Sequence, residues 1–458
     1  MTRLGKQLIA AIALGCAAQP LAAREAGPLP PDLPPLSEIE TADPEMPPVL
    51  PLREQARLMD ALLRERLDTL VPRLMRETGI DLWVVSAREY FEDPVTASML
   101  DAESLHARRR TILVFHDPGE GKPIERLTIS RYGLGGLFAP AWDPGAQPDQ
   151  WRALADAIAA RDPQRIGINT SPLHAFADGM TASEYTAFLA ALPEALRTRV
   201  VSAEPLAMRW LETRTPSEMA LYPLVVRSAH ALIAEAMSTR VITPGTTTAG
   251  DVEWWYRQRL SELGLKPWFH PSVGIQRQGA AGMLHGDTVI APGDLLWTDF
   301  GITYLRLNTD TQHLAYVPKP GESAVPEGLA AGLRNSNRVQ DLLREEFRTG
   351  RSGNAILAAA RAKAIGEGLD PSIYTHPIGF HGHGAGPSIG YWDNQNGSPS
   401  GAGAVNPDTA WSIELTSYAA VPEWGGQKVD FRTEEDAFFD GRMVRFIDGR
   451  QTAITLVR

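Results

Sequence analysis

Cysteine is almost missing from this sequence, because Cys16 is the only one among 458 residues. A folded body without further cysteines cannot mispair disulfides, even in an oxidising compartment. Long apolar runs are missing too, since no internal stretch approaches the roughly 18 residues that a membrane-spanning helix needs. There is no basic tract, and the net charge of −11 argues against non-specific binding to nucleic acids. We therefore expect no transmembrane segment and no nucleic acid partner.

The composition is otherwise that of an ordinary globular protein. Hydrophobic residues make up 43% and charged residues 22% of the chain, which is typical of domains with packed cores. Because 458 residues exceed the usual size of one domain, we expect two domains, each with a substantial core.

The first 23 residues have the features of a secretion signal. Arg3 and Lys6 form a positive start, Leu8–Leu14 form a short apolar core, and small residues follow at a plausible cleavage site. Cys16 lies in a sequence similar to the cleavage box of bacterial lipoproteins, so a lipid anchor is a second possibility. These features predict an exported bacterial protein, either periplasmic or secreted. The alternative is an amphipathic or unstructured start on a cytoplasmic protein.

Proline dominates residues 24–50, which contain the runs PLPPDLPPL and PEMPPVLP. Such a density of proline predicts an extended, solvated linker rather than packed structure. If Cys16 carried a lipid, this linker would serve as a tether.

The following segment predicts a smaller α/β domain over residues 51–206. Leucines recur near helical spacing over residues 51–79, and Gly79 is suited to end this helix. The short apolar strands DLWVV, TILVF, RLTI and RIGI then alternate with helices over 150–161 and 182–192. Alternating strands and helices are typical of an α/β domain.

A second domain is predicted over residues 213–458. Thr215-Pro216-Ser217-Glu218 is a strong helix start, since a hydroxyl cap precedes a proline and an acidic residue. This helix continues to near Pro244, and Pro223 inside it should kink or delay it. A second helix over 249–263 comes before a series of strands.

Five side chains of the second domain can form a metal site. Two aspartates lie in WTDFGITYLRLNTD, a histidine lies in GFHGHGAG, and glutamates lie in WSIEL and DFRTEED. They are Asp299, Asp310, His383, Glu414 and Glu434. Four carboxylates that converged on one point would repel one another and could not all ionise. Two divalent cations remove this difficulty, because a carboxylate can bridge metals roughly 3.5–4 Å apart.

The two aspartates lie in a run of apolar and β-branched residues that predicts a β-hairpin. Asp299 and Asp310 are symmetric about the bond between Tyr304 and Leu305. A turn centred there would place the aspartates directly opposite each other, with Cβ atoms roughly 4.5–5.5 Å apart on one face. This turn lacks the usual Gly or Asn, so a bulge or a longer loop could change the register.

Alternation along the strands distinguishes the glutamates. Glu414 falls on the polar face of its strand. In the last strand Glu434 shares a face with Arg432, whereas Glu435 falls on the apolar face. Glu434 is therefore the better ligand candidate, and Arg432 could hydrogen-bond the carboxylates and keep them ionised.

These segments resemble the pita-bread metallopeptidases, the family of methionine aminopeptidase, aminopeptidase P and prolidase, with the metal-free creatinase as a relative. The ligand order Asp, Asp, His, Glu, Glu matches, as do the H-x-x-G at His383 and the R-x-E that ends in Glu434. The resemblance covers residues 213–458 well. It implies an α+β fold: a C-terminal pita-bread (creatinase/aminopeptidase) domain, with helices outside a curved and largely antiparallel sheet, preceded by a smaller α/β creatinase-type N-terminal domain.

The resemblance also implies a role for each ligand. Asp299 would bind one metal, Asp310 and Glu434 would bridge the two, and His383 and Glu414 would complete the second. Glu414 would in addition be catalytic, as the proton shuttle.

Further residues match positions that contact substrate in the family. His285 in GMLHGD precedes the first aspartate and is expected to bind substrate and assist catalysis. Tyr418 follows Glu414 by four residues, as a tyrosine does in aminopeptidase P and prolidase. Arg432 is expected to bind substrate, and His381 is expected to be catalytic. Purely structural roles remain open for these residues.

Two departures from the family pattern stand out. Relatives carry a second histidine about seven residues after the ligand histidine, but position 390 is Gly390. His381 or His376 could take its role from another direction. After Asp310, Thr311-Gln312-His313 replaces the usual Thr-Arg run, and His313 is expected beside the site or on the outer face of the strand.

The predicted function is that of a dinuclear metallo-exopeptidase. It would hydrolyse an N-terminal peptide bond, Xaa-Pro, like aminopeptidase P or prolidase, by means of a water activated by both metals. One imidazole and no thiolate favour Mn²⁺, with Co²⁺, Fe²⁺ and Zn²⁺ as alternatives. The expected partners are a peptide substrate and a second copy of the chain in a homodimer. Two other functions remain open: a creatinase-like C–N hydrolase without metals, and a non-catalytic peptide-binding protein.

Overall fold

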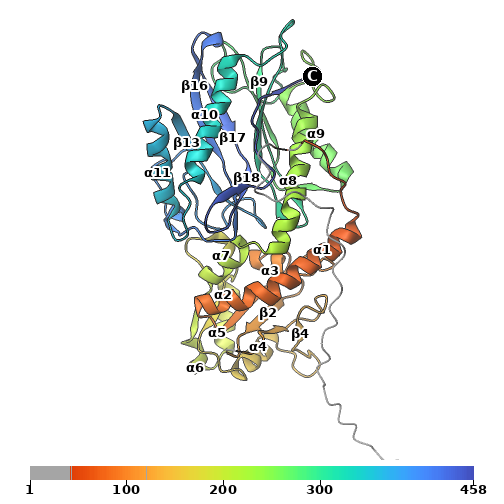
Figure 1. Ribbon diagram of the computed structural model, residues 1–458. Coiled ribbons are helices and arrows are strands. Elements are labelled where there is room, and N and C mark those ends of the chain that lie inside the picture. Colours follow the sequence, from red (N-terminus) through yellow and green to blue (C-terminus); the bar gives the residue numbers. More distant parts are fainter. Residues whose placement is uncertain (1–41, 43, 120) are drawn as a thin grey trace, which may run out of the picture.

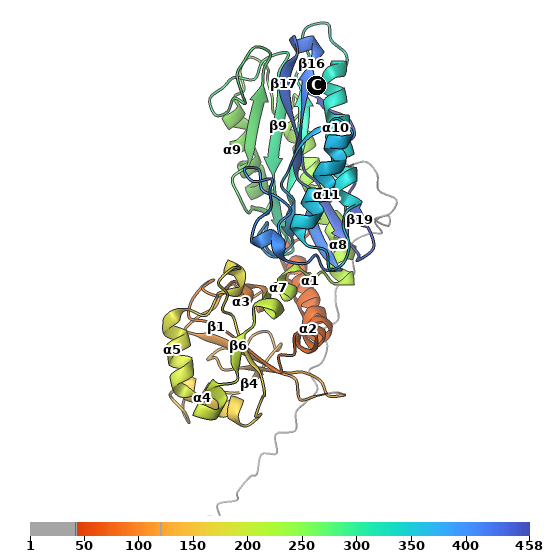
Figure 2. The ribbon, with the colours of Figure 1, turned by 90° about the vertical axis from the view of Figure 1, so that its left-hand side faces the viewer.

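The computed structural model describes residues 42, 44–119 and 121–458. The predicted signal peptide, and most of the predicted linker, lie outside the described residues. The chain forms two bodies stacked along one axis, an N-terminal domain below and a larger C-terminal domain above (Figure 1). Turned by 90°, the two remain separate lobes that meet along α1, α7 and the lower end of α8 (Figure 2). No helix in the described part of the chain is long and apolar enough to cross a membrane.

The N-terminal domain is built around a six-stranded sheet in the order β4-β3-β2-β1-β5-β6. The strands are β1 (Leu82–Ala87), β2 (Thr111–His116), β3 (Glu125–Thr128), β4 (Ala139–Pro140), β5 (Ile166–Ile168) and β6 (Val200–Ser202). Every residue of β1 is buried, because Trp83 and Val85 face one hydrophobic cluster while Leu82 and Val84 face another. The central strand therefore has helices or loops on both faces, as expected of an α/β domain.

Helices cover this sheet. They are α1 (Leu52–Glu65), the π-helix η2 (Arg66–Leu70), α2 (Val71–Thr78), α3 (Pro94–Met99), α4 (Gln150–Ala159), the 3₁₀-helix η3 (Ala175–Ala177), α5 (Ala182–Ala191), α6 (Glu194–Arg197) and α7 (Glu204–Glu212). The helix predicted over 51–79 corresponds to α1, η2 and α2, which end at Gly79 in the left-handed conformation, φ 65°. Leu206 and Trp210 of α7 belong to the N-terminal core. We therefore place the end of the domain at Glu212, beyond the predicted residue 206.

Four long helices lie outside the sheets of the C-terminal domain. They are α8 (Pro216–Ala236), α9 (Ala249–Leu263), α10 (Glu327–Arg344) and α11 (Gly353–Gly366). The capping box predicted at the start of α8 is present, because Thr215 and Glu218 each bond the backbone of the other. The helix starts at Pro216, so Pro223 does not delay it, and it ends at Ala236, before the predicted end near Pro244. Figure 1 shows α10 and α11 on one side of the strands and α8 and α9 on the other.

The strands of this domain are short segments of longer, bent strands. They are β7 (Lys266–Pro267), β8 (Ser272–Gln276), β9 (Leu295–Phe300), β10 (Ile302–Tyr304), β11 (Leu307–Asn308), β12 (Thr311–Tyr316), β13 (Asp370–Ile373), β14 (His376–Ile378), β15 (Thr409–Ser412), β16 (Leu415–Val421), β17 (Gln427–Thr433), β18 (Asp436–Phe439), β19 (Val444–Phe446) and β20 (Thr455–Leu456), with the 3₁₀-helices η4 (Ser400–Ala402) and η5 (Pro422–Trp424).

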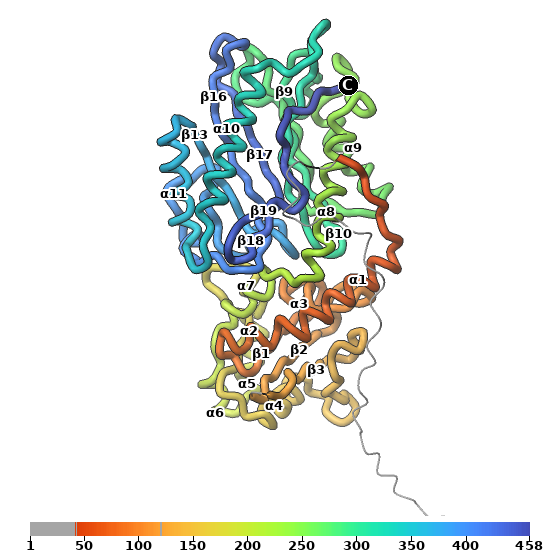
Figure 3. The backbone as a smooth tube through the Cα atoms, viewed as in Figure 1, coloured from red at the N-terminus to blue at the C-terminus, as the bar shows by residue number. Residues whose placement is uncertain are grey.

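Two of these bent strands meet at the predicted glutamates. Leu415 pairs with Thr433 across β16 and β17, and Ser412 pairs with Asp436 across β15 and β18. Both pairings follow one register, so Glu414 and Glu434 face each other at the bend between the two sheets. Figure 3 shows β16 and β17 running side by side, with β18 and β19 below them toward the domain junction. The curved sheet thus concentrates both glutamates at one level.

The hairpin with the aspartates has a different register from the predicted one. Its turn is centred on Leu305 and Arg306, which both have positive φ angles, 53° and 66°, as a type I′ turn requires. Asp299 is therefore paired with Gln312, not with Asp310. The prediction that the two aspartates are directly opposite was wrong. Asp310 lies two residues away from Gln312, diagonal to Asp299 and on the same face of the hairpin.

The tip of this hairpin ties the two domains together. The Arg306 guanidinium donates hydrogen bonds to the backbone oxygens of Leu100, at 2.6 Å, and Asp101, at 3.1 Å. Arg66 of the N-terminal domain is fully buried and donates to Glu218 of α8 at 2.9 Å. These contacts fix the N-terminal domain against the C-terminal one.

The end of the predicted linker is packed rather than solvated. Met46, Val49 and Leu50 pack against the core that α8 and α9 share with the hairpin. The Leu50 amide also donates to the hydroxyl of Tyr304, at 2.9 Å. The proline-rich composition gives an extended backbone here, but the apolar side chains between the prolines find a surface on the C-terminal domain.

Candidate metal centre

The bend of the sheet brings the predicted carboxylates together around a histidine. Oδ2 of Asp310, Oε2 of Glu414 and Oε1 of Glu434 lie 3.7, 3.7 and 3.5 Å from Nε2 of His376. Asp299 lies beside Asp310 on the same face of the hairpin. All four carboxylates that the sequence singled out therefore converge, from β9, the start of β12 and the two bends.

Burial makes this cluster unfavourable when all of its members are charged. Burial, and then the negative charge of Glu434, raise the pKa values of Asp299, Asp310 and Glu414 well above their ordinary range. Oδ1 of Asp299 and Oδ1 of Asp310 are buried and have no hydrogen-bond partner. Buried oxygens of this kind are costly unless a proton or a cation satisfies them.

The donor set fits divalent cations. Oxygen donors with one imidazole and no thiolate suit Mn²⁺ and similar ions. Ligand atoms of Asp310, His376 and Glu434 all lie within 4.8 Å of one another, close enough to share one ion. Bound cations would satisfy the aspartate oxygens that lack a hydrogen-bond partner.

The histidine at this position differs from the one that the sequence favoured. His383 is exposed, and its ring centre is 5.8 Å from that of His376 and 5.6 Å from that of Trp268. His376 is 3% exposed and lies on β14, paired with Ser412 next to the bend. The structure thus places His376, not His383, among the carboxylates.

The sequence contained a signal for this assignment. His376-Pro377-Ile378-Gly379 is also an H-x-x-G, and His383 follows His376 by seven residues. With His376 as the ligand histidine, His383 takes the spacing of the second histidine, and the departure at Gly390 disappears. Gly390 has φ 77°, and a Cβ there would lie 2.2 Å from the Ile373 carbonyl oxygen, so no histidine fits at that position.

Gln312 is a member of the site that the sequence analysis did not consider. Its side-chain amide donates hydrogen bonds to Glu414, at 2.9 Å, and to Glu434, at 2.7 Å. Its pairing opposite Asp299 in the hairpin puts it on the face of the carboxylates. The period of two along β12 counted from Asp310 could have indicated this.

The predicted substrate residues are scattered around this centre. Arg432 lies over the Trp297 ring at 5.1 Å and donates to Asp430 at 3.2 Å, and its charge opposes in part the rise that burial causes in the pKa of Asp299. His285 is exposed and its Nδ1 lies 3.0 Å from the Val273 oxygen. Within the described part of the chain, neither residue forms a hydrogen bond or an ion pair with a carboxylate of the centre.

Two other predicted residues contact aromatic or cationic neighbours. The Lys428 ammonium lies over the Tyr418 ring, 4.5 Å from the ring centre. Burial raises the pKa of the Tyr418 hydroxyl. His381 stacks on Phe176 of η3, with ring centres 3.8 Å apart. Burial lowers the pKa of His381 to about 4, so its ring is neutral at physiological pH, and its Nε2 has no partner.

A second buried cluster lies on the opposite face of β12 and the last bend. Nε2 atoms of His230 and His313 lie 3.0 and 2.9 Å from the two oxygens of Glu435, and Nδ1 of His230 lies 2.9 Å from Asp448. Arg227 also donates to Asp448, at 2.8 Å. His313 and Glu435 thus lie on the outer face, one of the two positions that the sequence left open for His313.

The ligand atoms of His230, His313 and Glu435 are also close enough to share a metal ion, but each is already satisfied. Although burial opposes charge, Glu435 and Asp448 raise the pKa of His230 to about 10. Although burial opposes charge at Glu435 too, His313 and His230 hold its pKa at about 2. This second cluster is a network of ion pairs.

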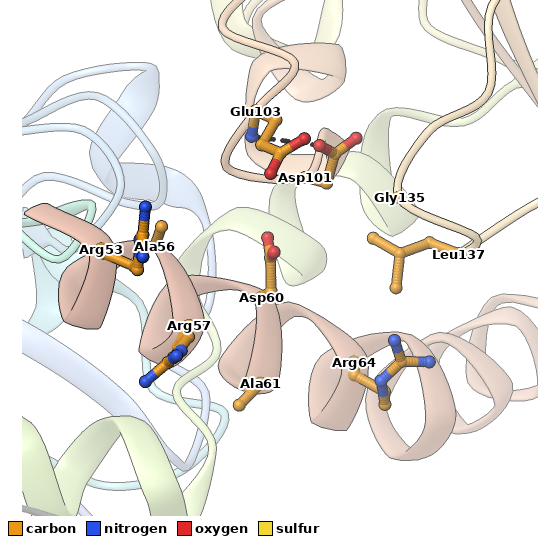
Figure 4. A pocket seen from close by; sticks show the side chains of 10 residues that line it. All are labelled: Arg53, Ala56, Arg57, Asp60, Ala61, Arg64, Asp101, Glu103, Gly135 and Leu137. Carbon is orange, nitrogen blue, oxygen red and sulfur yellow. Dashed lines mark hydrogen bonds between the residues drawn. The ribbon is translucent and has the colours of Figure 1, made fainter. Parts of the chain in front are cut away.

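A pocket of about 540 Å³ lies away from both clusters, between α1 and loops of the N-terminal domain. Figure 4 shows Asp60 of α1 pointing toward Asp101 and Glu103, with arginines along the same helix. Its lining residues are Arg53, Ala56, Arg57, Asp60, Ala61, Arg64, Asp101, Glu103, Gly135 and Leu137. None of them belongs to the predicted site.

Comparison with known proteins places this geometry in a family. Residues 225–448 match the family model of metallopeptidase family M24. An X-Pro aminopeptidase from Thermotoga maritima has a similar structure, with a TM-score of 0.60 and 16% identity over 84% of this chain and all of the other. No match was found among curated protein sequences.

Two further solved structures have the same architecture. One is a variant of aminopeptidase P from Escherichia coli, with a TM-score of 0.58 and 12% identity over 84% of this chain and 94% of the other. The other is an Xaa-Pro dipeptidase from Bacillus anthracis, with a TM-score of 0.53 and 16% identity over 89% of this chain and all of the other. Residues 225–448 are therefore an M24 metallopeptidase domain, and the C-terminal domain that contains them has the pita-bread fold.

Proposed function

We propose that this protein is a dinuclear metallo-exopeptidase that cleaves the N-terminal residue from peptides with proline in second position. The observation that carries the proposal is the meeting of three carboxylates at His376, with Asp299 beside them and two aspartate oxygens left without a partner. A buried cluster with such an excess of negative charge needs cations. The relatives named X-Pro aminopeptidase and Xaa-Pro dipeptidase support the choice of substrate.

The proposed ligands are Asp299, Asp310, His376, Glu414 and Glu434. His376 replaces His383 in the predicted set because only His376 contacts the carboxylates. When bound, two divalent cations, proposed to be Mn²⁺, would supply Lewis acidity and a water of lowered pKa.

Glu414 is the proposed proton shuttle. Its side chain is 21% exposed, compared with 8% for Asp310 and 1% for Glu434, so substrate and solvent reach it more easily than they reach those two carboxylates. Burial, and then the charge of Glu434, raise its pKa well above the ordinary range, which favours uptake of a proton by this carboxylate.

His383 is the proposed second histidine of the reaction. The residue is exposed at its rim, it lies edge-on to both His376 and Trp268, and partial burial of its ring lowers its pKa. A neutral imidazole at the rim can donate one hydrogen bond to the substrate carbonyl as negative charge develops there. His381 is held by Phe176 of the N-terminal domain, so we propose that this domain narrows access to the centre.

The test is hydrolysis of a peptide panel by protein loaded with Mn²⁺. The panel contains Xaa-Pro dipeptides, longer Xaa-Pro peptides and peptides without proline. We expect cleavage of Xaa-Pro bonds that falls to background in Asp310→Ala and is retained in Asp370→Ala. Asp370 is the control because it is an exposed aspartate paired with Lys428 at 2.8 Å.

Two results would overturn the proposal. One is cleavage by Asp310→Ala at the wild-type rate, which would favour a metal-free C–N hydrolase. The other is a folded protein with bound metal that cleaves no peptide of the panel. The ligand assignment has its own check, since His376→Ala should lose bound metal and His383→Ala should lose activity while keeping the metal.

A further inference from the structure

Gln312 bonds two members of the carboxylate cluster although it carries no charge. It is 3% exposed and pairs opposite Asp299 on β9. Its backbone exchanges two hydrogen bonds with that of Glu434, at 3.1 and 3.2 Å. The side chain therefore starts from a backbone position that is fixed relative to the last bend.

The orientation of its amide group is set by Trp297. The indole Nε1 donates to Oε1 of Gln312 at 2.9 Å, and an indole N–H can only donate. The amide oxygen must therefore face Trp297, and the NH₂ group must face the glutamates. The Trp297 ring is itself buried, with the Arg432 guanidinium 5.1 Å from its centre, so the donor cannot easily turn away.

Both N–H groups of the amide are used on candidate ligands. They point to Oε1 of Glu414, at 2.9 Å, and Oε2 of Glu434, at 2.7 Å. The remaining oxygens, Oε2 of Glu414 and Oε1 of Glu434, face His376 at 3.7 and 3.5 Å, and Oε1 of Glu434 also accepts a hydrogen bond from the Ser412 hydroxyl. The Gln312 amide thus bonds one oxygen of each glutamate, and the other oxygen of each glutamate faces His376.

A neutral donor is well suited to this task. A lysine or arginine here would place a positive charge beside the proposed cations and repel them, whereas an amide adds no net charge. Two carboxylates that face each other at the bend would otherwise swing apart to reduce their repulsion. A partner that bonds both at once keeps them together at little electrostatic cost.

We propose that Gln312, aligned by Trp297, is a positioning residue of the metal centre, which presents one oxygen of Glu414 and one of Glu434 to the metals. The inference rests on the proposed function, because it needs these glutamates to be ligands. It concerns a residue that touches the ligands rather than the substrate. Its effect should therefore appear in metal binding before it appears in turnover.

The experiment is calorimetric titration of metal-free protein with Mn²⁺ alone. Gln312→Met removes both N–H donors at nearly constant volume, and Trp297→Phe keeps the amide but removes the donor that orients it. The control is Gln150→Met, because Gln150 is also buried and its amide also bonds two acceptors, the backbone oxygens of Arg110 and Ile129. Thermal unfolding of each metal-free variant reports its fold.

We expect Gln312→Met to weaken Mn²⁺ binding by about 10–100-fold, the usual cost of losing a group that orients metal ligands. Trp297→Phe should weaken it in the same direction by less, and Gln150→Met should leave it unchanged. Mn²⁺ affinity in Gln312→Met equal to that of the wild type would overturn the inference and leave the metal centre intact. If Gln312→Met did not fold, wild-type affinity in Trp297→Phe would overturn it instead.

A wild-type protein that bound Mn²⁺ no better than Asp310→Ala would overturn the metal centre itself, and the role of Gln312 with it. Readout of metal binding and of peptide hydrolysis on the same samples separates these two failures. Loss of turnover in Gln312→Met with unchanged Mn²⁺ affinity would count against a positioning role.

Discussion

Two buried clusters of histidines and carboxylates lie back to back in this domain, and they have opposite charge balance. On one face of the sheet, Asp310, Glu414 and Glu434 surround the imidazole of His376, and Asp299 lies beside Asp310. On the other face, two carboxylates face two imidazoles and one guanidinium. Neighbouring residues of the same strands, Glu434 and Glu435, belong to different clusters, because successive side chains of a strand point to opposite faces.

The comparison shows what distinguishes a metal centre from an ion-pair network of similar composition. In the outer cluster each carboxylate has a positive partner, and the pKa of Glu435 is low, at about 2. In the inner cluster the pKa values of Asp299, Asp310 and Glu414 are raised, and two aspartate oxygens have no partner. Ligand atoms lie close together in both clusters. The metal centre is therefore distinguished by its unpartnered oxygens and its surplus of negative charge.

Loss of a carboxylate should lower the free energy of unfolding more in the outer cluster, that of His230, His313, Glu435 and Asp448, than in the inner cluster around His376. Glu435→Gln leaves the buried imidazoles of His230 and His313 without their shared anion, so we expect the free energy of unfolding to fall by about 3–5 kcal/mol. Denaturant unfolding of the metal-free protein measures this. Glu434→Gln, one residue away, is the matched comparison and should cost less, since it removes surplus negative charge. An equal loss in both variants would contradict the distinction between the clusters.

Metal should stabilise the protein, and more strongly at higher pH. The folded pKa values of Asp299 and Glu414 are raised above their ordinary values of 3.8 and 4.5, so these two groups contribute most to the stability of the metal-free protein below those values. Their contribution is lost as the pH rises through the folded pKa values. Mn²⁺ at about 100 times its Kd should add about 2.7 kcal/mol.

Thermal unfolding with Mn²⁺ and with chelator checks this pH dependence. The stabilisation by Mn²⁺ should be larger at about pH 8 than at about pH 5, because metal then competes with fewer protons. A stabilisation that is independent of pH would indicate binding away from the inner cluster. Asp310→Ala serves as the reference that should show no stabilisation at either pH.

The smallest expected effect is a gain in stability. Asp310→Asn removes one of the like charges at little change in shape, so the metal-free protein should gain about 1 kcal/mol or more, the repulsion of two charges about 4 Å apart even in water. Asp370→Asn, on the exposed surface, should change the stability little. A loss of stability in Asp310→Asn, measured in chelator, would mean that its carboxylate is already satisfied in the metal-free protein.

Local patterns in the sequence predicted several features that the structure contains. The hydroxyl, proline and acid before α8 predicted a capping box that the structure contains. Alternation along the last strand separated Glu434 from Glu435, and the two glutamates do lie on opposite faces. These features depend on residues close in sequence, where the period of a strand or the first turn of a helix decides the geometry. Export through residues 1–23, a lipid on Cys16 and a homodimer stay predictions of the sequence.

The tertiary structure decided the rest. The turn of the aspartate hairpin depends on positive φ angles at Leu305 and Arg306. Arg306 also bonds the N-terminal domain from this turn. Neither residue is a usual turn residue, so the sequence near the turn did not predict its position. The choice of His376 over His383 depends on which part of the histidine-rich segment continues the bent sheet beside Ser412.

The amide of Gln312 joins the centre through pairing across more than 100 residues of chain, to Glu414 and Glu434. The sequence by itself determined the residue types at the centre, because charge and alternation are local properties. Only the tertiary structure determined which atoms meet there, because the contacts of a curved sheet join segments that are distant in the chain, and their register depends on how every intervening strand packs.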